Sequence, residues 1–214
     1  MMKLIGGAFA LQLIVLTSAW ACDGQVGAPI FQDDFSDTSG GWDQVAPESL
    51  VKPPVYEFAI DANCDSCASQ NITFNATDGD YCMDAVLPKA PAANNQIYVG
   101  IEFWATDYNN SMLALLASNG QMELLRETAG NWQTIFTVPN AKGFNAAVGA
   151  VNTIRATALA GKITVYLNGA LVQAVRAQEP TNTSLKFGMF AETDTAIANA
   201  PVIQIKSFSV TAGQ

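Results

Sequence analysis

The sequence predicts an all-β protein in which two antiparallel sheets pack as a jelly-roll-like sandwich. Two strand-like stretches, 162–167 and 171–175, flank Asn168-Gly169. A tight primed turn needs positive φ at both central residues, which makes Asn-Gly the strongest short hairpin signal. A third such stretch, 153–158, comes just before, across Ala160-Gly161. Helical periodicity is scarce after residue 21, and short apolar alternations recur instead, as is typical of a sandwich.

The expected strands are separated by turn-forming residues. Asp78-Gly79 joins the third and fourth as a hairpin, and the sixth and seventh are preceded by 107–110 and Asn119-Gly120. The chain shows no internal repeat and no second domain. In order, we expect strands at 29–32, 55–60, 72–74, 81–87, 97–104, 112–117, 122–126, 132–138, 153–158, 162–167, 171–175, 186–190 and 202–210.

The first 21 residues are typical of a secretory signal. A basic start is followed by the apolar run 4–16, and Ala19-Trp20-Ala21 places small residues at −3 and −1 of a cleavage point. The run is too short for a comfortable membrane span, and no later stretch approaches one. We therefore expect a secreted or periplasmic protein whose residues 22–214 form one sandwich domain. An alternative makes Cys22 the lipid-anchored first residue of a lipoprotein.

Charge and composition exclude several functions. The 214-residue chain has a net charge of −9, which argues against nucleic acids and anionic membranes as partners. It contains no histidine, so the commonest general base and the commonest transition-metal ligand are both absent. An enzyme would have to use carboxylates, Tyr, Lys or a hard metal ion, which lowers the expectation of catalysis.

The four cysteines are expected to form disulfides. An even number in an exported protein indicates two bonds, with three connectivities open. A redox or zinc role for the Cys-x-x-Cys pair is disfavoured, because no βαβ setting is present and two further zinc ligands would be needed. The cysteines are Cys22, Cys64, Cys67 and Cys82.

Several segments together resemble the concanavalin A-like (laminin G-like, lectin/glucanase) superfamily, nearest to bacterial exported domains of the 3-keto-disaccharide hydrolase type. The resemblance implies a sandwich fold and a role in glycan binding, glycoside hydrolysis or adhesion. The segments are Phe31-Gln-Asp-Asp-Phe35, Gly41-Trp42, Tyr98-Val-Gly-Ile-Glu-Phe103, Asp107-Tyr-Asn-Asn110, Gly120, Leu124-Leu-Arg126, Trp132, Asn152-Thr-Ile-Arg155, Ile163-Thr-Val-Tyr-Leu-Asn-Gly169 and Ile205-Lys-Ser-Phe-Ser-Val210.

The chain departs from the superfamily's glucanases at the catalytic motif. Those enzymes carry Glu-x-Asp-x-x-Glu on one strand face. The only Glu-x-Asp here is Glu192-Thr-Asp194, and no Glu follows three residues later. Whether the protein is an enzyme is left open, with the balance against it. The candidate carboxylate pairs for general acid–base work are Glu102 with Glu123 or with Glu127, and the favoured alternative is that these are scattered surface acids.

Polar and aromatic side chains opposite the apolar set make a candidate ligand-binding face. Aromatic rings stack on the apolar faces of sugars, while Glu, Arg and Asn bond to hydroxyls. The alternative is an ordinary solvated sheet face, where Tyr, Thr and Arg are common. If their strands are neighbours, the face comprises Tyr98, Glu102, Trp104, Arg155, Thr157, Thr164 and Tyr166.

Turn-proximal groups supply the remaining candidates. Tyr108 could rim a binding site, whereas Trp42 and Trp132 are expected to pack. No cofactor is expected, although oxygen ligands on two loops suit a structural Ca²⁺. Turn formation by Asp explains the same residues. These acids are Asp33, Asp34, Asp37 and Asp194.

The sequence thus favours an exported, non-catalytic module that binds carbohydrate or another extracellular polymer. A glycoside-acting hydrolase or lyase that uses carboxylates is the first alternative. A structural or adhesion domain whose sheet contacts another protein is the second.

Overall fold

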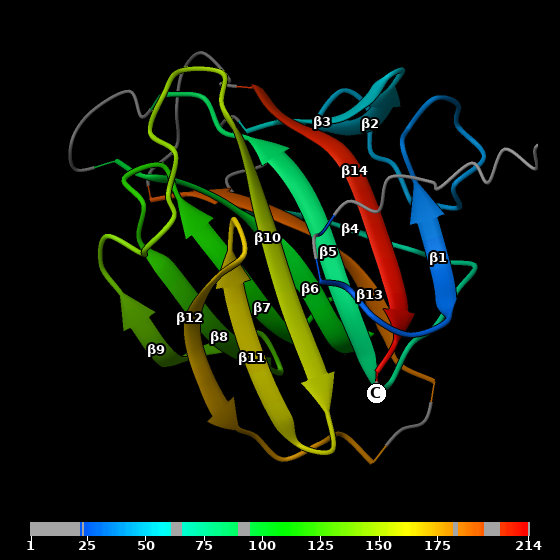
Figure 1. Cartoon of the computed structure of the whole chain (residues 1–214). Helices are drawn as coiled ribbons and strands as arrows, with labels where there is room; N and C mark the ends of the chain where they lie inside the picture. The colour runs from blue at the N-terminus through cyan, green and yellow to red at the C-terminus, as the bar shows by residue number, and fades with distance from the viewer. Residues whose placement is uncertain are drawn as a thin grey trace, which may run out of the picture.

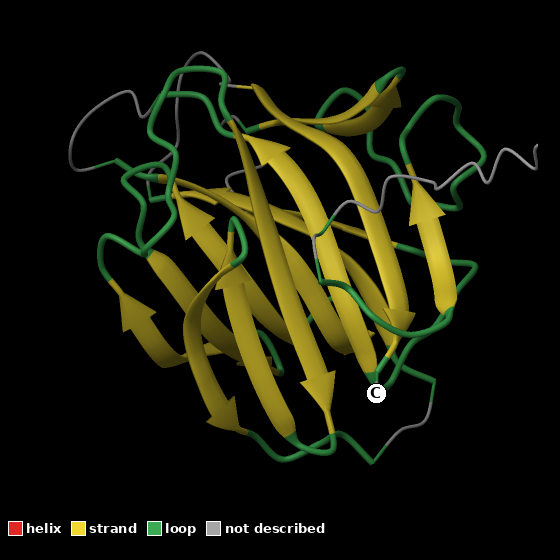
Figure 2. Cartoon of the chain, in the orientation of Figure 1, coloured by secondary structure: helices red, strands yellow, loops and turns green. Residues whose placement is uncertain are grey.

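The protein is an all-β sandwich of two antiparallel sheets, as predicted (Figures 1 and 2). The computed structural model describes residues 22, 24–60, 66–89, 95–181, 184–194 and 202–213. These residues form strands, turns and loops, and none of them lies in a helix that could cross a membrane. The expected signal at 1–21 lies outside the described residues.

The described residues form fourteen strands, which are divided between the two sheets. One sheet has the order β12-β11-β10-β5-β14-β3-β2, with β1 also paired to β14, and the other has the order β4-β13-β6-β7-β8-β9. The strands are β1 (Pro29–Asp33), β2 (Ser49–Lys52), β3 (Val55–Ala59), β4 (Ser66–Gln70), β5 (Gly79–Val86), β6 (Ile97–Asp107), β7 (Asn110–Ala117), β8 (Met122–Thr128), β9 (Asn131–Val138), β10 (Val151–Leu159), β11 (Lys162–Leu167), β12 (Ala170–Arg176), β13 (Lys186–Thr193) and β14 (Val202–Ala212).

The predicted hairpin across Asp78-Gly79 is wrong. Residues 72–74 form no strand, and β5 lies between β10 and β14 rather than beside its chain neighbour. Ile72 is exposed, so its apolar side chain marks no core position. Strands β2 and β4 were not predicted. The Ser-Cys-Ala-Ser-Gln sequence of β4 lacks the branched and aromatic residues that mark strands, and β4 forms through its pairing with β13.

The core lies between the sheets and is rich in aromatic rings. Phe187 and Phe208 stack with ring centroids 5.7 Å apart, and Trp42 packs edge-on to Phe208 at 5.2 Å. Trp42 is therefore a packing residue, as predicted. Such pairs add to the free energy gained by burying their area.

Trp104 also belongs to this core, which corrects its expected place on the opposite face. The pairing of β6 with β7 shifts register between Phe103 and Asp107, and Trp104 has φ 53°. A bulge of this kind redirects a side chain, so consecutive residues both point inward. The indole Nε1 donates to the Thr77 carbonyl oxygen at 2.6 Å, and only 2 % of Trp104 is exposed.

A disulfide ties the N-terminal segment to the eight-stranded sheet. Cys22 is bonded to Cys82 in β5, across a sequence separation of 60. The Cys22 sulfur cannot also carry a thioether-linked lipid, so this disulfide and the lipoprotein alternative exclude each other. Cys67 is disulfide-bonded as well, and Cys64 lies outside the described residues.

Candidate functional site

The outer face of the six-stranded sheet contains two of the predicted ligand-binding residues. Register pairs place Glu102 beside Leu113, and Tyr98 beside Ala117. Tyr98 is 8 % exposed and Glu102 is 1 % exposed. Apolar neighbours cover this face, so it is neither an open aromatic platform nor a solvated surface. Those neighbours are Leu113, Leu115, Ala117, Leu125 and Phe190.

Trp132 shows how strongly this sheet is curved. Its strand β9 lies four positions from β13, roughly 19 Å away in a flat sheet. The ring of Trp132 nevertheless lies 5.4 Å from that of Phe190 on β13. The six-stranded sheet must therefore be curved so that its outer face is concave, and this curvature buries the middle of that face. Trp132 packs against Phe190 on this concave face and is 41 % exposed. It does not pack in the core between the sheets, contrary to the prediction.

Glu102 is the most perturbed carboxyl group on the outer face. Burial raises its pKa to about 7, while the nearby Gln70 amide and Ser111 hydroxyl oppose the shift and Glu127 and Asp43 add to it. Gln70 Nε2 donates to Glu102 Oε1 at 3.1 Å. The other oxygen, Oε2, has no hydrogen-bond partner among the described residues. A carboxyl group in this setting holds its proton up to neutral pH.

Arg155 and Tyr166 lie on the other sheet, which corrects the expectation that their strands neighbour β6. Arg155 forms a two-point ion pair with Asp80, at 2.8 Å through Nε and 2.7 Å through Nη2. Its guanidinium lies 5.0 Å from the centre of the Tyr166 ring. The predicted face is thus divided between opposite sides of the sandwich.

The carboxylates suggested for calcium bind nearby donors. Asp33 Oδ1 accepts from Phe35 N and its Oδ2 from Trp42 Nε1, both at 2.7 Å. Asp34 and Asp37 accept from backbone N–H groups two residues on, as turn-forming Asp does. Asp194 instead accepts from Gln96 N at 2.8 Å. No group of three metal-binding side chains occurs in the described part of the chain.

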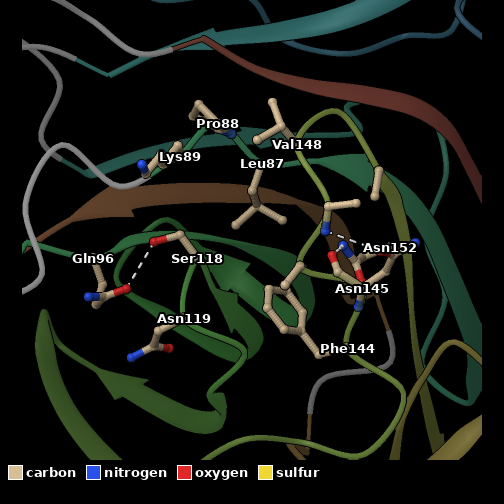
Figure 3. A pocket seen from close by; sticks show the side chains of 13 residues that line it. Leu87, Pro88, Lys89, Gln96, Ser118, Asn119, Phe144, Asn145, Val148 and Asn152 are labelled. Carbon is tan, nitrogen blue, oxygen red and sulfur yellow. Dashed lines mark hydrogen bonds between the residues drawn. The ribbon is translucent and has the colours of Figure 1, made fainter.

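A pocket of about 610 Å³ opens at one end of the sandwich, where β5 ends and β6 and β10 begin (Figure 3). We call it the end pocket. Its apolar lining comprises Leu87, Pro88, Phe144, Val148 and three alanines. Its polar lining comprises Lys89, Gln96, Ser118, Asn119, Asn145 and Asn152. The half-exposed Tyr108 lies in the β6–β7 turn and is not part of this lining.

The loop before β10 is held in place by two asparagines. Asn152 Oδ1 accepts from Asn145 N at 2.9 Å, and its Nδ2 donates to Asn145 O at 3.0 Å. Asn168 Nδ2 donates to Gly143 O at 2.8 Å and to Asn152 Oδ1 at 2.9 Å. The Asn168-Gly169 turn, evident in the sequence, thus positions the loop that carries Phe144.

The second Asn-Gly turn, Asn119-Gly120, packs against the Phe144 ring. Gly120 has φ +86°, and a Cβ at that position would lie 2.5 Å from Phe144 Cδ1. Only glycine therefore allows both the turn and the close approach of the ring. Gly120 O accepts from Ala141 N at 2.8 Å, which ties the loop to the turn.

The end-pocket residues were not predicted from the sequence. Phe144, Asn145 and Lys89 come from loops with no regular spacing, so no periodicity brings them together. The available signal was indirect: two Asn-Gly turns and the residue Asn152, which fall at one end of the sandwich once the strands are in order.

The fold is a two-sheet, jelly-roll-like sandwich, and comparison with solved structures agrees. The chain is similar to the Bacillus licheniformis beta-glucanase (TM-score 0.63, 13% identity, 87% of this chain and 99% of that one). It is also similar to the carbohydrate-binding module CBM66 from Bacillus subtilis (TM-score 0.58, 14%, 78% and 94%). A third is the laminarinase catalytic domain from Thermotoga maritima (TM-score 0.61, 9%, 87% and 98%). No protein-family model and no curated protein sequence matches the chain.

Proposed function

We propose that the protein is an exported glycan-binding module without catalytic activity, and that the end pocket is its binding site. The observation that carries the proposal is the lining of this pocket. It combines the half-buried ring of Phe144 with neutral amides and a hydroxyl. Sugar rings need such a combination of an apolar surface and a few directed polar groups.

The lining favours binding over hydrolysis. Glycosidases need two carboxyl groups on either side of the scissile bond. Among its described residues the end pocket has no carboxyl group, and its one charged lining residue is Lys89. Two of the similar structures are named as a glucanase and a laminarinase, and one as a carbohydrate-binding module, which supports a carbohydrate ligand for this chain.

The alternative is a hydrolase of the 3-keto-disaccharide type that uses Glu102. Its elevated pKa of about 7 suits a general acid. Its 1 % exposure argues against this role, because substrate would have to displace the side chains that cover it. Turnover of disaccharides or 3-keto sugars that is lost in Glu102→Gln would establish the alternative.

Binding can be tested on immobilised polysaccharides. Phe144→Ala should reduce retention by about tenfold, because a stacking ring contributes on the order of 1 kcal/mol or more. Leu171→Ala is the matched control, since Leu171 is 58 % exposed on a different surface and should leave retention unchanged. Equal retention of both variants, or no retention of the wild type by any polysaccharide, would contradict the proposal and favour the adhesion alternative.

Export is part of the same proposal. The Cys22–Cys82 bond supports it, since disulfides persist in oxidising compartments. Mass spectrometry of protein from its native host should find the chain starting near Cys22 and without free thiols. Structural calcium remains a prediction, to be tested by melting with and without a chelator.

A further inference from the structure

We propose that the end pocket selects acidic sugars, with the Lys89 ammonium group as the counter-ion of a ligand carboxylate. This inference rests on the proposed function and names the ligand class for the same site. It concerns a sugar ring that carries one carboxylate, as uronic acids do.

The charge of the pocket differs from that of the whole chain. The protein has a net charge of −9, yet the charged residue in the described lining is a lysine. Lys89 is exposed and forms no ion pair with any described residue. Its charge is therefore available to a ligand.

The walls of the pocket provide a place for such a ring. Figure 3 shows Lys89 and Gln96 along one wall, with Phe144 and Val148 along the other. A ring stacked on Phe144 would point its substituents across the pocket toward Lys89. The ammonium can then reach a carboxylate without displacing any existing contact of its own.

The remaining polar groups suit neutral hydroxyls. Ser118 Oγ donates to Gln96 Oε1 at 3.0 Å and accepts from Ile97 N, so this pair is fixed in place. Asn119 Oδ1 accepts from Gln121 N at 2.9 Å, which leaves its Nδ2 for a ligand. Amides do not distinguish charge, so Lys89 is the group that would discriminate between acidic and neutral sugars.

The nearby carboxylates lie outside the lining and accept hydrogen bonds from other groups of the protein. Asp194 bonds to the backbone of Gln96 but does not line the pocket. Glu123 accepts from Gln121 Nε2 and also lies outside the lining. A ligand carboxylate would therefore meet one positive charge and neutral donors.

Calorimetry with matched ligands tests the inference. The probes are oligomers of galacturonate, glucuronate and mannuronate, each compared with its neutral methyl ester. At low ionic strength the wild type should bind at least one acid about fivefold more tightly than its ester, the effect of one exposed ion pair. Lys89→Gln should remove this preference, so that the variant binds acid and ester with equal affinity. Lys142→Gln should keep the preference, because Lys142 is an exposed cation of the loop that carries Phe144 and lies outside the lining.

The outcomes separate the two proposals. Equal affinity for acid and ester, or preference for the ester, overturns the acidic-sugar inference while glycan binding stands. A preference that survives Lys89→Gln also overturns it. If no oligomer or polysaccharide binds, or if Phe144→Ala has no effect, the proposed function fails and the inference fails with it.

Discussion

The outer face of the six-stranded sheet and the end pocket contain similar kinds of side chain in different settings. On the outer face, Tyr98 and Glu102 belong to regular strands of a curled sheet, and their neighbours cover them. At the end pocket, Phe144 and Asn119 belong to loops beyond the strand ends. Curvature closes the first region, whereas loop geometry opens the second. An aromatic residue on the outward side of a strand is therefore not sufficient evidence of a ligand face.

The largest expected effect is on the outer face. Tyr98→Ala should lower the free energy of unfolding by about 3–5 kcal/mol, as removal of a buried ring does. Urea denaturation measures this loss, and glycan retention per folded molecule should stay the same.

Tyr98→Phe is the control for that variant, because it keeps the ring and should recover most of the stability. If Tyr98→Ala has normal stability but no longer retains glycan, the outer face and not the end pocket is the binding site.

A second expected effect concerns pH and Glu102. The folded-state pKa of about 7 lies above the ordinary value of 4.5, so the folded protein binds the proton more tightly than the unfolded chain. This stabilising contribution is complete below pH 4.5 and is lost as the pH rises through 7. The change is on the order of 3 kcal/mol. Glu102→Gln should make the unfolding free energy flatter between pH 5 and 8.

Glu123→Gln serves as the comparison, since Glu123 is a more exposed carboxylate on the same sheet. If wild type and Glu102→Gln lose stability equally over this pH range, Glu102 is not the group that titrates.

The smallest expected effect concerns Gly120, which fixes the position of Phe144 in the end pocket. Gly120→Ala should cost about 1–2 kcal/mol for positive φ and should also displace Phe144, which weakens glycan binding. Gly169 has φ +76°, and a Cβ there would meet no atom within 4 Å. Gly169→Ala should therefore lower the free energy of unfolding only through the strained backbone. Thermal melts and affinity gels distinguish the two. Normal retention by Gly120→Ala would show that the ring position is unimportant.

Local signals explain why the strands from β6 onward could be predicted. Alternation in 97–103 and the two Asn-Gly turns depend on neighbouring residues, so the sequence contains them directly. The β5 pairing could not be predicted, because its partners β10 and β14 lie far along the chain. Strand β4 has weak propensity of its own and depends on β13.

The site was harder to predict because it depends on curvature and on loops. Alternation correctly predicted that Tyr98 and Glu102 point away from the core. It could not predict the curvature of the sheet that buries them. It also failed at Trp104, where a bulge reverses the side chain. Whether β6 and β10 share a sheet is a matter of topology, and the strands belong to opposite sheets.

The bonds made by Asn168 bear on the chemical ageing of the protein. Its side-chain nitrogen donates to two acceptors at once, Gly143 O and Asn152 Oδ1. Deamidation, in which water adds and ammonia leaves, would turn this residue into aspartate and set a negatively charged oxygen against both acceptors. Two attractions would become two repulsions, and the loop that carries Phe144 would lose one of its anchors without any change in the strands.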